Sequence, residues 1–168
     1  RVVELDRKQP EHKMTFAEYF QKVVTQQRID EARQKLAENW PLLQLVWQRY
    51  RVQPRFIVTL WGVESSFGRT MGTFNVPAAL ATLAFDGRRG AMFRGELLAA
   101  LKILDQGNVA PSGMVGSWAG AMGQCQFMPT TYLTYAVDLS GDGRRDIWNS
   151  TSDVLGSIGN YVSRLGWR

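Results

Sequence analysis

The stretch from Pro54 to Gly68 constrains the fold more than any other part of the chain, because its apolar residues are too continuous for a surface helix. Proline is favoured in the first turn of a helix, and glycine is favoured just beyond the last turn. The sequence therefore predicts a helix that is buried on most sides. Glu64 shares one face of that helix with Ile57 and Trp61, so the pattern places a carboxyl group among apolar side chains.

Glu64 has two interpretations at this point. Burial disfavours the charged form of a carboxyl group and raises its pKa. Such a group can hold a proton near neutral pH and donate it as a general acid. Alternatively, Glu64 is a structural residue that pairs with one of the arginines, because buried carboxylates are usually paired. The helix alone does not decide between them.

Helical periodicity extends over most of the chain, after a polar lead-in that we expect to be extended over residues 1–13. Further helices are predicted near residues 15–24, 29–39, 41–50, 78–85, 93–107 and 152–166. A glycine-rich loop is expected over residues 108–123. Strand signals are nearly absent. The predicted fold class is therefore mainly α with at most a very small β-sheet, in a single domain over residues 1–168.

Composition excludes several classes of site. The chain has one cysteine and one histidine, so it holds no internal disulfide and no histidine-rich metal site. The net charge of +5 fits a polyanionic partner, which includes nucleic acid, an anionic membrane and acidic cell-wall polymer. It equally fits a solvated basic surface. No nucleic-acid-binding motif accompanies the charge, so we expect no nucleic acid partner.

Residues 138–149 resemble the calcium loop of an EF-hand. Oxygen-bearing side chains occupy loop positions 1, 3, 5 and 9, and glycine occupies position 6: Asp138, Ser140, Asp142, Asp146 and Gly143. Position 12 is Asn149 instead of the usual glutamate, and the next acid is Asp153. The spacing favours a structural calcium ion over an ion-free polar turn. No second loop of this kind occurs, so a calcium sensor is not expected.

Several stretches of the sequence resemble the B-type lytic transglycosylases. These are bacterial peptidoglycan-cleaving enzymes with a lysozyme-like core. The resemblance rests on Glu-Ser-Ser-Phe-Gly at residues 64–68, Arg-Arg at 88–89, residues 116–129, the loop that begins at Asp138, and residues 156–167. It covers nearly the whole chain. It implies a lysozyme-like α-domain with an EF-hand-like loop.

The resemblance also implies roles for individual residues. Glu64 matches the sole catalytic acid and base of the family. Residues that match substrate-binding positions are Arg88, Arg89, Ser117, Met122, Gln126, Phe127 and Tyr161. The ligands of the EF-hand-like calcium site match Asp138, Ser140, Asp142, the carbonyl of Arg144, and Asp153. Asp153 departs from the family pattern, because the spacer before it is one residue longer than expected.

The implied reaction cleaves the bond between N-acetylmuramic acid and N-acetylglucosamine and leaves 1,6-anhydromuramic acid ends, without a catalytic cofactor. Two alternatives remain. A lysozyme-type hydrolase would use Glu64 and a second carboxylate, for which Asp86 is the nearest candidate in the sequence. A non-catalytic glycan-binding or calcium-binding module would use neither.

The resemblance further implies a location and partners. We expect a monomer that acts on peptidoglycan strands in the periplasm of a Gram-negative bacterium, in association with the outer membrane. A lipid tether is expected only for a longer form, since the sequence contains no lipidation site. The family continues beyond the position of Arg168, so a C-terminal truncation that removes part of the cleft is an open expectation.

Overall fold

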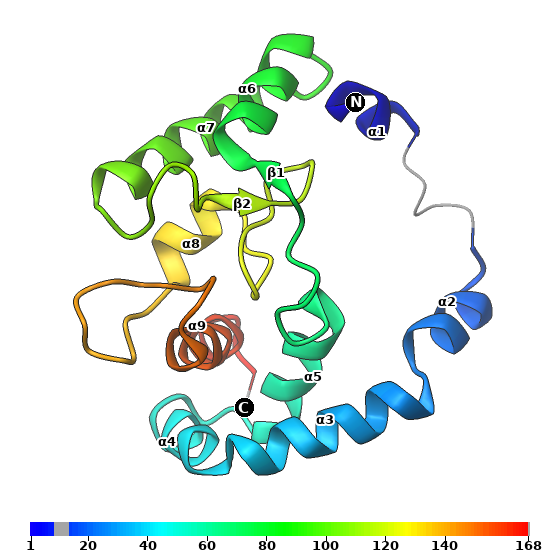
Figure 1. Cartoon of the computed structure of the whole chain (residues 1–168), viewed down its shortest axis with the longest axis vertical. Coiled ribbons are helices and arrows are strands. Elements are labelled where there is room, and N and C mark those ends of the chain that lie inside the picture. Colours follow the sequence, from blue (N-terminus) through cyan, green and yellow to red (C-terminus); the bar gives the residue numbers. More distant parts are fainter. Residues whose placement is uncertain (9–13, 168) are drawn as a thin grey trace.

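The computed structural model describes residues 1–8 and 14–167, which are mainly helical (Figure 1). The helices in these residues are α1 (Val2–Lys8), α2 (Phe16–Val23), α3 (Gln26–Glu38), α4 (Trp40–Tyr50), α5 (Pro54–Ser65), α6 (Val76–Asp86), α7 (Gly90–Asp105), α8 (Pro129–Tyr135) and α9 (Thr151–Arg164). Two short strands, β1 (Phe74–Asn75) and β2 (Val115–Gly116), pair antiparallel with Phe74 opposite Gly116. The predicted class, mainly α with a very small sheet, is confirmed.

Helix α5 lies in the interior, as its composition predicts. It packs against α3, α4 and α9, and Ile57, Val58 and Trp61 are buried along it. Helices α6 and α7 pair with each other, and in Figure 1 they lie across the small sheet from α5. Helix α7 also contacts α8. Helix α9 approaches α4 so closely that a Cβ atom added to Gly159 would lie 2.5 Å from the Val46 side chain. Because α4 and α9 both also contact α5, these three helices pack together.

The N-terminal prediction was wrong. Residues 2–8 form helix α1 instead of an extended lead-in, and residues 9–13 lie outside the described part. The cause is a tertiary contact. Asp6 is 1% exposed and accepts hydrogen bonds from Arg88 and Arg89 at the turn between α6 and α7. A local sequence pattern contains no information about arginines 82 positions away.

Helix α2 lies at the periphery of the molecule (Figure 1). The helix predicted near residues 15–24 begins with a capping box, in which the Thr15 N–H donates to the Glu18 carboxylate at 2.8 Å. None of its residues is buried, and Phe16 and Phe20 are exposed. Within residues 1–8 and 14–167, neither α2 nor another helix combines the length and apolar character needed to cross a membrane.

Candidate active site

Glu64 lies one residue before the C-terminal end of α5, at a sharp reversal of the chain. The helix was expected to stop at Gly68, but it ends at Ser65, because Ser66 and Phe67 adopt left-handed backbone conformations with φ of 50° and 58°. The Ser65 hydroxyl accepts a hydrogen bond from the Gly68 N–H at 3.0 Å, which closes the turn. Residues other than glycine rarely adopt this conformation, and such strain concentrates at functional sites.

A pocket of about 220 Å³ opens beside the Glu64 carboxyl group. Its walls come from α5, residues 125–131 and α9, and it is lined by Leu60, Glu64, Cys125, Gln126, Phe127, Met128, Thr131, Ile158 and Tyr161. Glu64 is exposed to solvent and not buried as its helix pattern suggested, but the protein packed beside its carboxyl group still raises the pKa of that group. Glu64 is the one carboxylic acid among the lining residues.

Glu64 makes no hydrogen bond and no ion pair within the described part of the chain, so the structural interpretation, a carboxylate paired with an arginine, is not supported. Asp86, the second acid considered from the sequence, pairs with Arg7 at 2.9 Å and does not line the pocket. A single unpaired carboxyl group with a raised pKa is suited to donate a proton to a bound substrate.

The wall opposite Glu64 contains three of the residues predicted to bind substrate. Gln126 has a left-handed backbone with φ of 50°, and its Nε2 donates to the carbonyls of Met71 at 3.1 Å and Gly123 at 2.8 Å. The rings of Phe127 and Tyr161 contact each other with their centroids 5.2 Å apart. These contacts hold an amide and two aromatic rings against the pocket, a combination that suits a sugar ring.

The other four predicted substrate residues lie outside this pocket. Met122 is fully buried, and its backbone pairs with that of Phe127. The Ser117 hydroxyl accepts N–H groups of the loop that follows it. Arg88 and Arg89 bind Asp6 at the contact between α1 and the α6–α7 turn. The structure thus places Gln126, Phe127 and Tyr161 in the pocket lining with Glu64, whereas Ser117, Met122, Arg88 and Arg89 do not line it.

Sequence reasoning did not assign a role to two residues that the structure places at this site. Cys125 lines the pocket, and burial together with the charge of Glu64 raises the pKa of its thiol. Gln124 is buried and bonds to Trp61 on α5. Both lie in the stretch of small, amide and aromatic residues that the sequence indicated as a candidate site. Composition identifies that stretch, but it does not tell which side chains face the pocket and which face the core.

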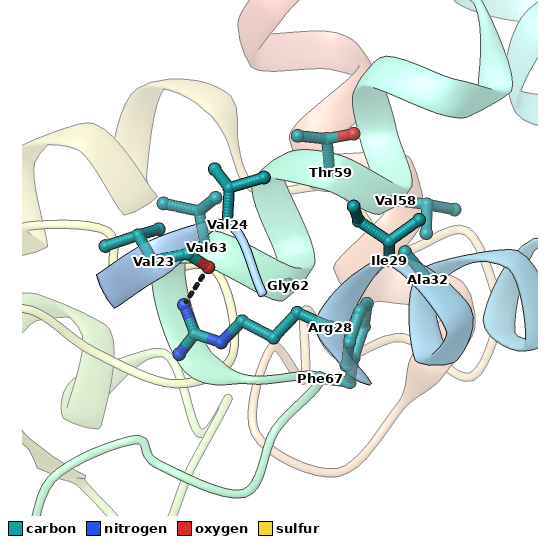
Figure 2. Close-up of a pocket in the computed structure, with 10 residues that line it drawn as sticks. All are labelled: Val23, Val24, Arg28, Ile29, Ala32, Val58, Thr59, Gly62, Val63 and Phe67. Atoms are coloured by element: carbon teal, nitrogen blue, oxygen red, sulfur yellow. Dashed lines mark hydrogen bonds between the residues drawn. The ribbon is translucent and has the colours of Figure 1, made fainter. Parts of the chain in front are cut away.

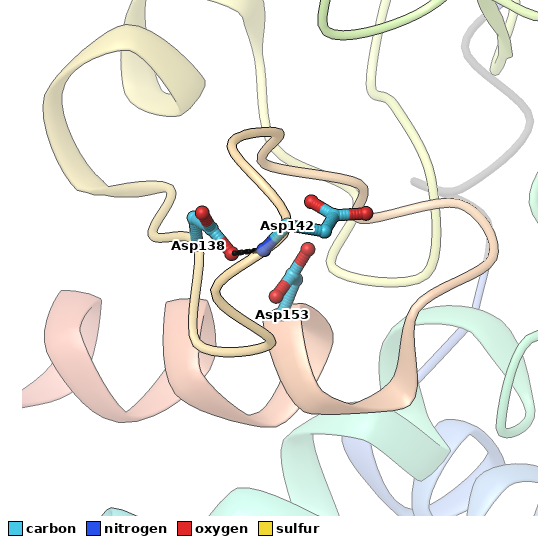
Figure 3. Close-up of side chains that lie close together, drawn as sticks. All are labelled: Asp138, Asp142 and Asp153. Carbon is cyan, nitrogen blue, oxygen red and sulfur yellow. Dashed lines mark hydrogen bonds between the residues drawn. The ribbon is translucent and has the colours of Figure 1, made fainter.

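The acidic loop brings three carboxylates together, as Figure 3 shows. Oxygen atoms of Asp138, Asp142 and Asp153 lie within 4.8 Å of one another. Asp138 accepts the N–H groups of Gly141 at 2.6 Å and Gly143 at 2.8 Å, which curl the loop around its carboxylate. Carboxylate oxygens on a glycine-containing loop are the ligands that calcium prefers. The donor set therefore fits a hard divalent cation.

Asp153 belongs to this cluster despite the long spacer before it. It is fully buried, and its carboxylate accepts the N–H groups of Leu139, Ser140 and Asp146, each at 2.9 Å. Asp146, which occupies loop position 9, instead accepts the N–H groups of the following turn through its side chain. Asp153 thus reaches the loop, and its place in the cluster does not depend on the length of the spacer expected from the family pattern.

A second pocket, of about 230 Å³, lies between α5 and the helices α2 and α3 and is shown in Figure 2. Apolar side chains from α2, α3 and α5 surround it, together with the guanidinium group of Arg28. That group donates to the Val23 carbonyl at 3.2 Å and to the Ser66 hydroxyl at 3.1 Å, which ties α3 to the turn after Glu64. No carboxylate lines this pocket, so it offers no acid for catalysis.

The family, the relative and the solved structures that this chain matches are all transglycosylases. The profile of the family described as "Transglycosylase SLT domain" matches residues 1–168. Membrane-bound lytic murein transglycosylase B of Escherichia coli strain K12 is 45% identical over 126 residues, which are 74% of this chain and 35% of that protein.

Solved structures agree in fold over 99% of this chain. SltB3 from Pseudomonas aeruginosa in complex with NAG-anhNAM-pentapeptide has a TM-score of 0.96, 48% identity and 44% of its chain covered. The Escherichia coli lytic transglycosylase Slt35 in complex with calcium has a TM-score of 0.89, 38% identity and 53% of its chain covered. The chain thus spans about a third of the first relative and about half of the solved ones.

Proposed function

The chain belongs to the transglycosylase SLT domain family, among the B-type lytic transglycosylases, and we propose that it cleaves peptidoglycan without water, with Glu64 as its single catalytic residue. The predicted family is confirmed, and so is the lysozyme-like fold class, by the match to Slt35. Residues 1–168 act in this proposal as one catalytic domain. The complex of SltB3 with NAG-anhNAM-pentapeptide supports peptidoglycan as the substrate class.

The observation that carries the proposal is that Glu64 is the one acid lining its pocket and has no polar partner there. Protonated Glu64 donates its proton to the glycosidic oxygen between N-acetylmuramic acid and N-acetylglucosamine as the bond to C1 breaks. The resulting carboxylate then takes the proton of the muramic C6 hydroxyl, whose oxygen forms the new bond to C1. The product is a 1,6-anhydro sugar, and Glu64 is protonated again.

The hydrolase alternative is less well supported. Inverting and retaining glycosidases use two carboxyl groups that flank the scissile bond. Within the described residues the pocket offers one, and the Asp86 carboxylate is occupied by Arg7. A purely binding module has no use for a carboxyl group with a raised pKa and no partner.

Substrate contacts in this proposal come first from Gln126, Phe127 and Tyr161, which line the pocket. Ser117 and Met122 contribute indirectly, through the loop and backbone pairing that hold this wall. Arg88 and Arg89 keep 40% of their side-chain surface exposed while they bind Asp6, so a carboxylate on a long glycan strand can still reach them.

A calcium ion is proposed for the acidic loop, as in the Slt35 complex. Asp138, Ser140, Asp142, the carbonyl of Arg144, and Asp153 would hold it. The ion would neutralise the mutual repulsion of three carboxylates and take no part in bond cleavage. We also propose a monomer in the periplasm of a Gram-negative bacterium, near the outer membrane. The membrane-bound relative supports that location, with a lipid tether in a longer form.

The test of the proposed function is Glu64→Gln, assayed on purified peptidoglycan. The amide keeps the size of the side chain but cannot donate and recover a proton, so turnover should fall by roughly 10²–10⁴-fold while glycan binding and folding persist. Asp86→Asn is the matched control. Its carboxylate lies outside the pocket, so activity should remain near the wild-type level. Near-normal turnover by Glu64→Gln would refute the assignment.

A further inference from the structure

Gln124 connects α5 to the C-terminal end of the acidic loop through one buried amide. Its Oε1 accepts the indole N–H of Trp61 at 2.8 Å, and its Nε2 donates to the carbonyl of Trp148 at 2.8 Å. Its backbone N–H donates to Ile147, also at 2.8 Å. Gln124, Trp61 and Trp148 are each 9% exposed or less. Hydrogen bonds shielded from water in this way are costly to break, because each leaves a buried polar group unpaired.

The amide contacts the chain on both sides of Glu64. Trp61 precedes Glu64 by one helical turn, and Gly68 follows it after the left-handed reversal. A Cβ atom on Gly68 would lie 2.6 Å from the Gln124 Oε1, so the backbone there packs directly against the amide. The Trp61 ring meets Phe67 edge to face, with centroids 5.4 Å apart. Gln124 therefore touches the segment that carries Glu64 at two separate points.

Gln124 also begins the segment that forms the opposite wall of the pocket. The next residues, Cys125, Gln126 and Phe127, all line the pocket beside Glu64. One side chain thus bonds to the helix that carries the acid, and its own backbone continues into the wall that faces the acid. Displacement of this amide would change the separation between Glu64 and the wall.

We propose that Gln124 is a positioning residue, which sets the distance between the Glu64 carboxyl group and the pocket wall at residues 125–127. This inference rests on the proposed function, since it assigns Gln124 a role in the reaction of Glu64. Gln124 itself is not among the residues that line the pocket, so in this proposal it acts through its neighbours. A misplacement of about 1 Å in a catalytic group can lower the rate about 100-fold, so a small shift suffices for a kinetic effect.

Loss of the two hydrogen bonds of the Gln124 amide, to Trp61 and Trp148, has a second consequence. An amide that only stabilised the fold would not produce it. The pKa of Glu64 is raised by the protein packed around it. If the wall moves away, less protein packs beside the carboxyl group, which is already exposed on its solvent side, and its pKa falls toward the ordinary value. The other titratable groups that line the pocket are Cys125 and Tyr161, and neither carries a positive charge. In this proposal, the hydrogen bonds of Gln124 to Trp61 and Trp148 therefore limit the access of water to Glu64.

The experiment compares Gln124→Met, Trp61→Phe and the double variant with the wild type. Methionine has a similar length and makes neither hydrogen bond, whereas phenylalanine keeps an aromatic ring and lacks the indole N–H. Tyr132→Phe is the matched control, because it removes one part-buried hydrogen bond, to the Arg145 carbonyl at 2.6 Å, and keeps the ring that packs on Trp148; Tyr132 does not line the pocket. Kinetics are measured at a temperature at which circular dichroism shows each protein folded. If Gln124→Met does not fold, Trp61→Phe carries the test.

We expect kcat to fall roughly 10- to 100-fold in both single variants, with KM little changed and the double variant no worse than either. The pKa of Glu64, measured by carbon NMR of its labelled carboxyl group, should fall in these variants and stay unchanged in Tyr132→Phe. This titration needs no activity, so an inactive wild type would count against the proposed function alone. Wild-type kcat and an unchanged Glu64 pKa in a folded Gln124→Met would overturn the inference.

Discussion

Glu64 owes its chemical character to its place at the end of α5. Within the described residues its carboxyl group has no hydrogen-bonding or ionic partner, and the surrounding protein raises its pKa. The helical spacing of Ile57, Trp61 and Glu64 was enough to predict a carboxyl group among apolar residues. The absence of a partner depends on where every arginine lies in space, and no spacing along the chain contains that information.

The pH dependence of stability should report this environment. The folded protein holds the Glu64 proton more tightly than the unfolded chain does. The resulting stabilisation is complete below a pH of about 4.5, the ordinary pKa of a glutamate, and is lost as the pH rises through the raised pKa. Urea unfolding of wild type and Glu64→Gln across this range should show the wild type losing stability relative to the variant. A difference that does not change with pH would contradict the raised pKa.

Activity should depend on pH in the same direction. The reaction begins with protonated Glu64, so kcat should fall as the pH rises through the raised pKa. A pH series of initial rates on purified peptidoglycan measures this decline. A kcat that increases steadily through the same range would contradict the role of Glu64 as proton donor.

Among the structural elements, the acidic loop is the one whose side chains offer a ligand set for the proposed calcium ion. Three carboxylate oxygens lie within 4.8 Å of one another, and Asp153 is fully buried. The sequence predicted the loop ligands by their spacing but left Asp153 in question. The structure includes it, because its buried carboxylate accepts N–H groups of Leu139, Ser140 and Asp146 and lies with those of Asp138 and Asp142.

Calcium should therefore raise the melting temperature of the wild type. A ligand at 100 times its dissociation constant stabilises a folded protein by about 2.7 kcal/mol. Asp142→Asn should weaken this response, since it removes one carboxylate from an exposed loop position and leaves the buried Asp153 in place. Asp30→Asn, on exposed α3, is the control and should respond as the wild type does. The melting temperature is read by circular dichroism with and without calcium. An equal rise in Asp142→Asn would argue against the site.

Element boundaries also show where local patterns stop being informative. The starts of α2, α4 and α5 were predicted, because capping-box and proline signals act within one turn. The helical state of residues 2–8 was not predicted, since it depends on Asp6 meeting Arg88 and Arg89. Helix α5 ends before Gly68 because Ser66 and Phe67 accept a left-handed backbone.

At the scale of the whole molecule, Asp6 joins the N-terminal helix to the turn between α6 and α7. Hydrogen bonds from Arg88, opposed by burial and joined by Arg89, lower the pKa of Asp6 to about 2. Asp6 thus contributes stability that is present above a pH of about 3.8 and is lost as the pH falls through about 2. Two arginines that approach a carboxylate 82 and 83 positions away place α1 against the body of the protein.

Asp6→Asn should lower the free energy of unfolding at neutral pH by about 1–3 kcal/mol, because the arginines lose their charged acceptor. The loss should shrink as the pH falls toward 2, where wild-type Asp6 is itself protonated. Urea denaturation at a series of pH values measures both effects. A deficit that stays constant down to pH 2 would mean that the charge of Asp6 is not the cause.

The central claim is that one carboxyl group, Glu64, performs both proton transfers and that no water enters the product. Digestion of purified peptidoglycan in ¹⁸O-labelled water, followed by mass spectrometry of the released fragments, tests it most directly. We predict fragments one water lighter than hydrolytic products, with no ¹⁸O incorporated and no reducing muramic end, and their loss in Glu64→Gln. Fragments with a reducing end that carries ¹⁸O would contradict the claim and indicate a hydrolase with a second acid.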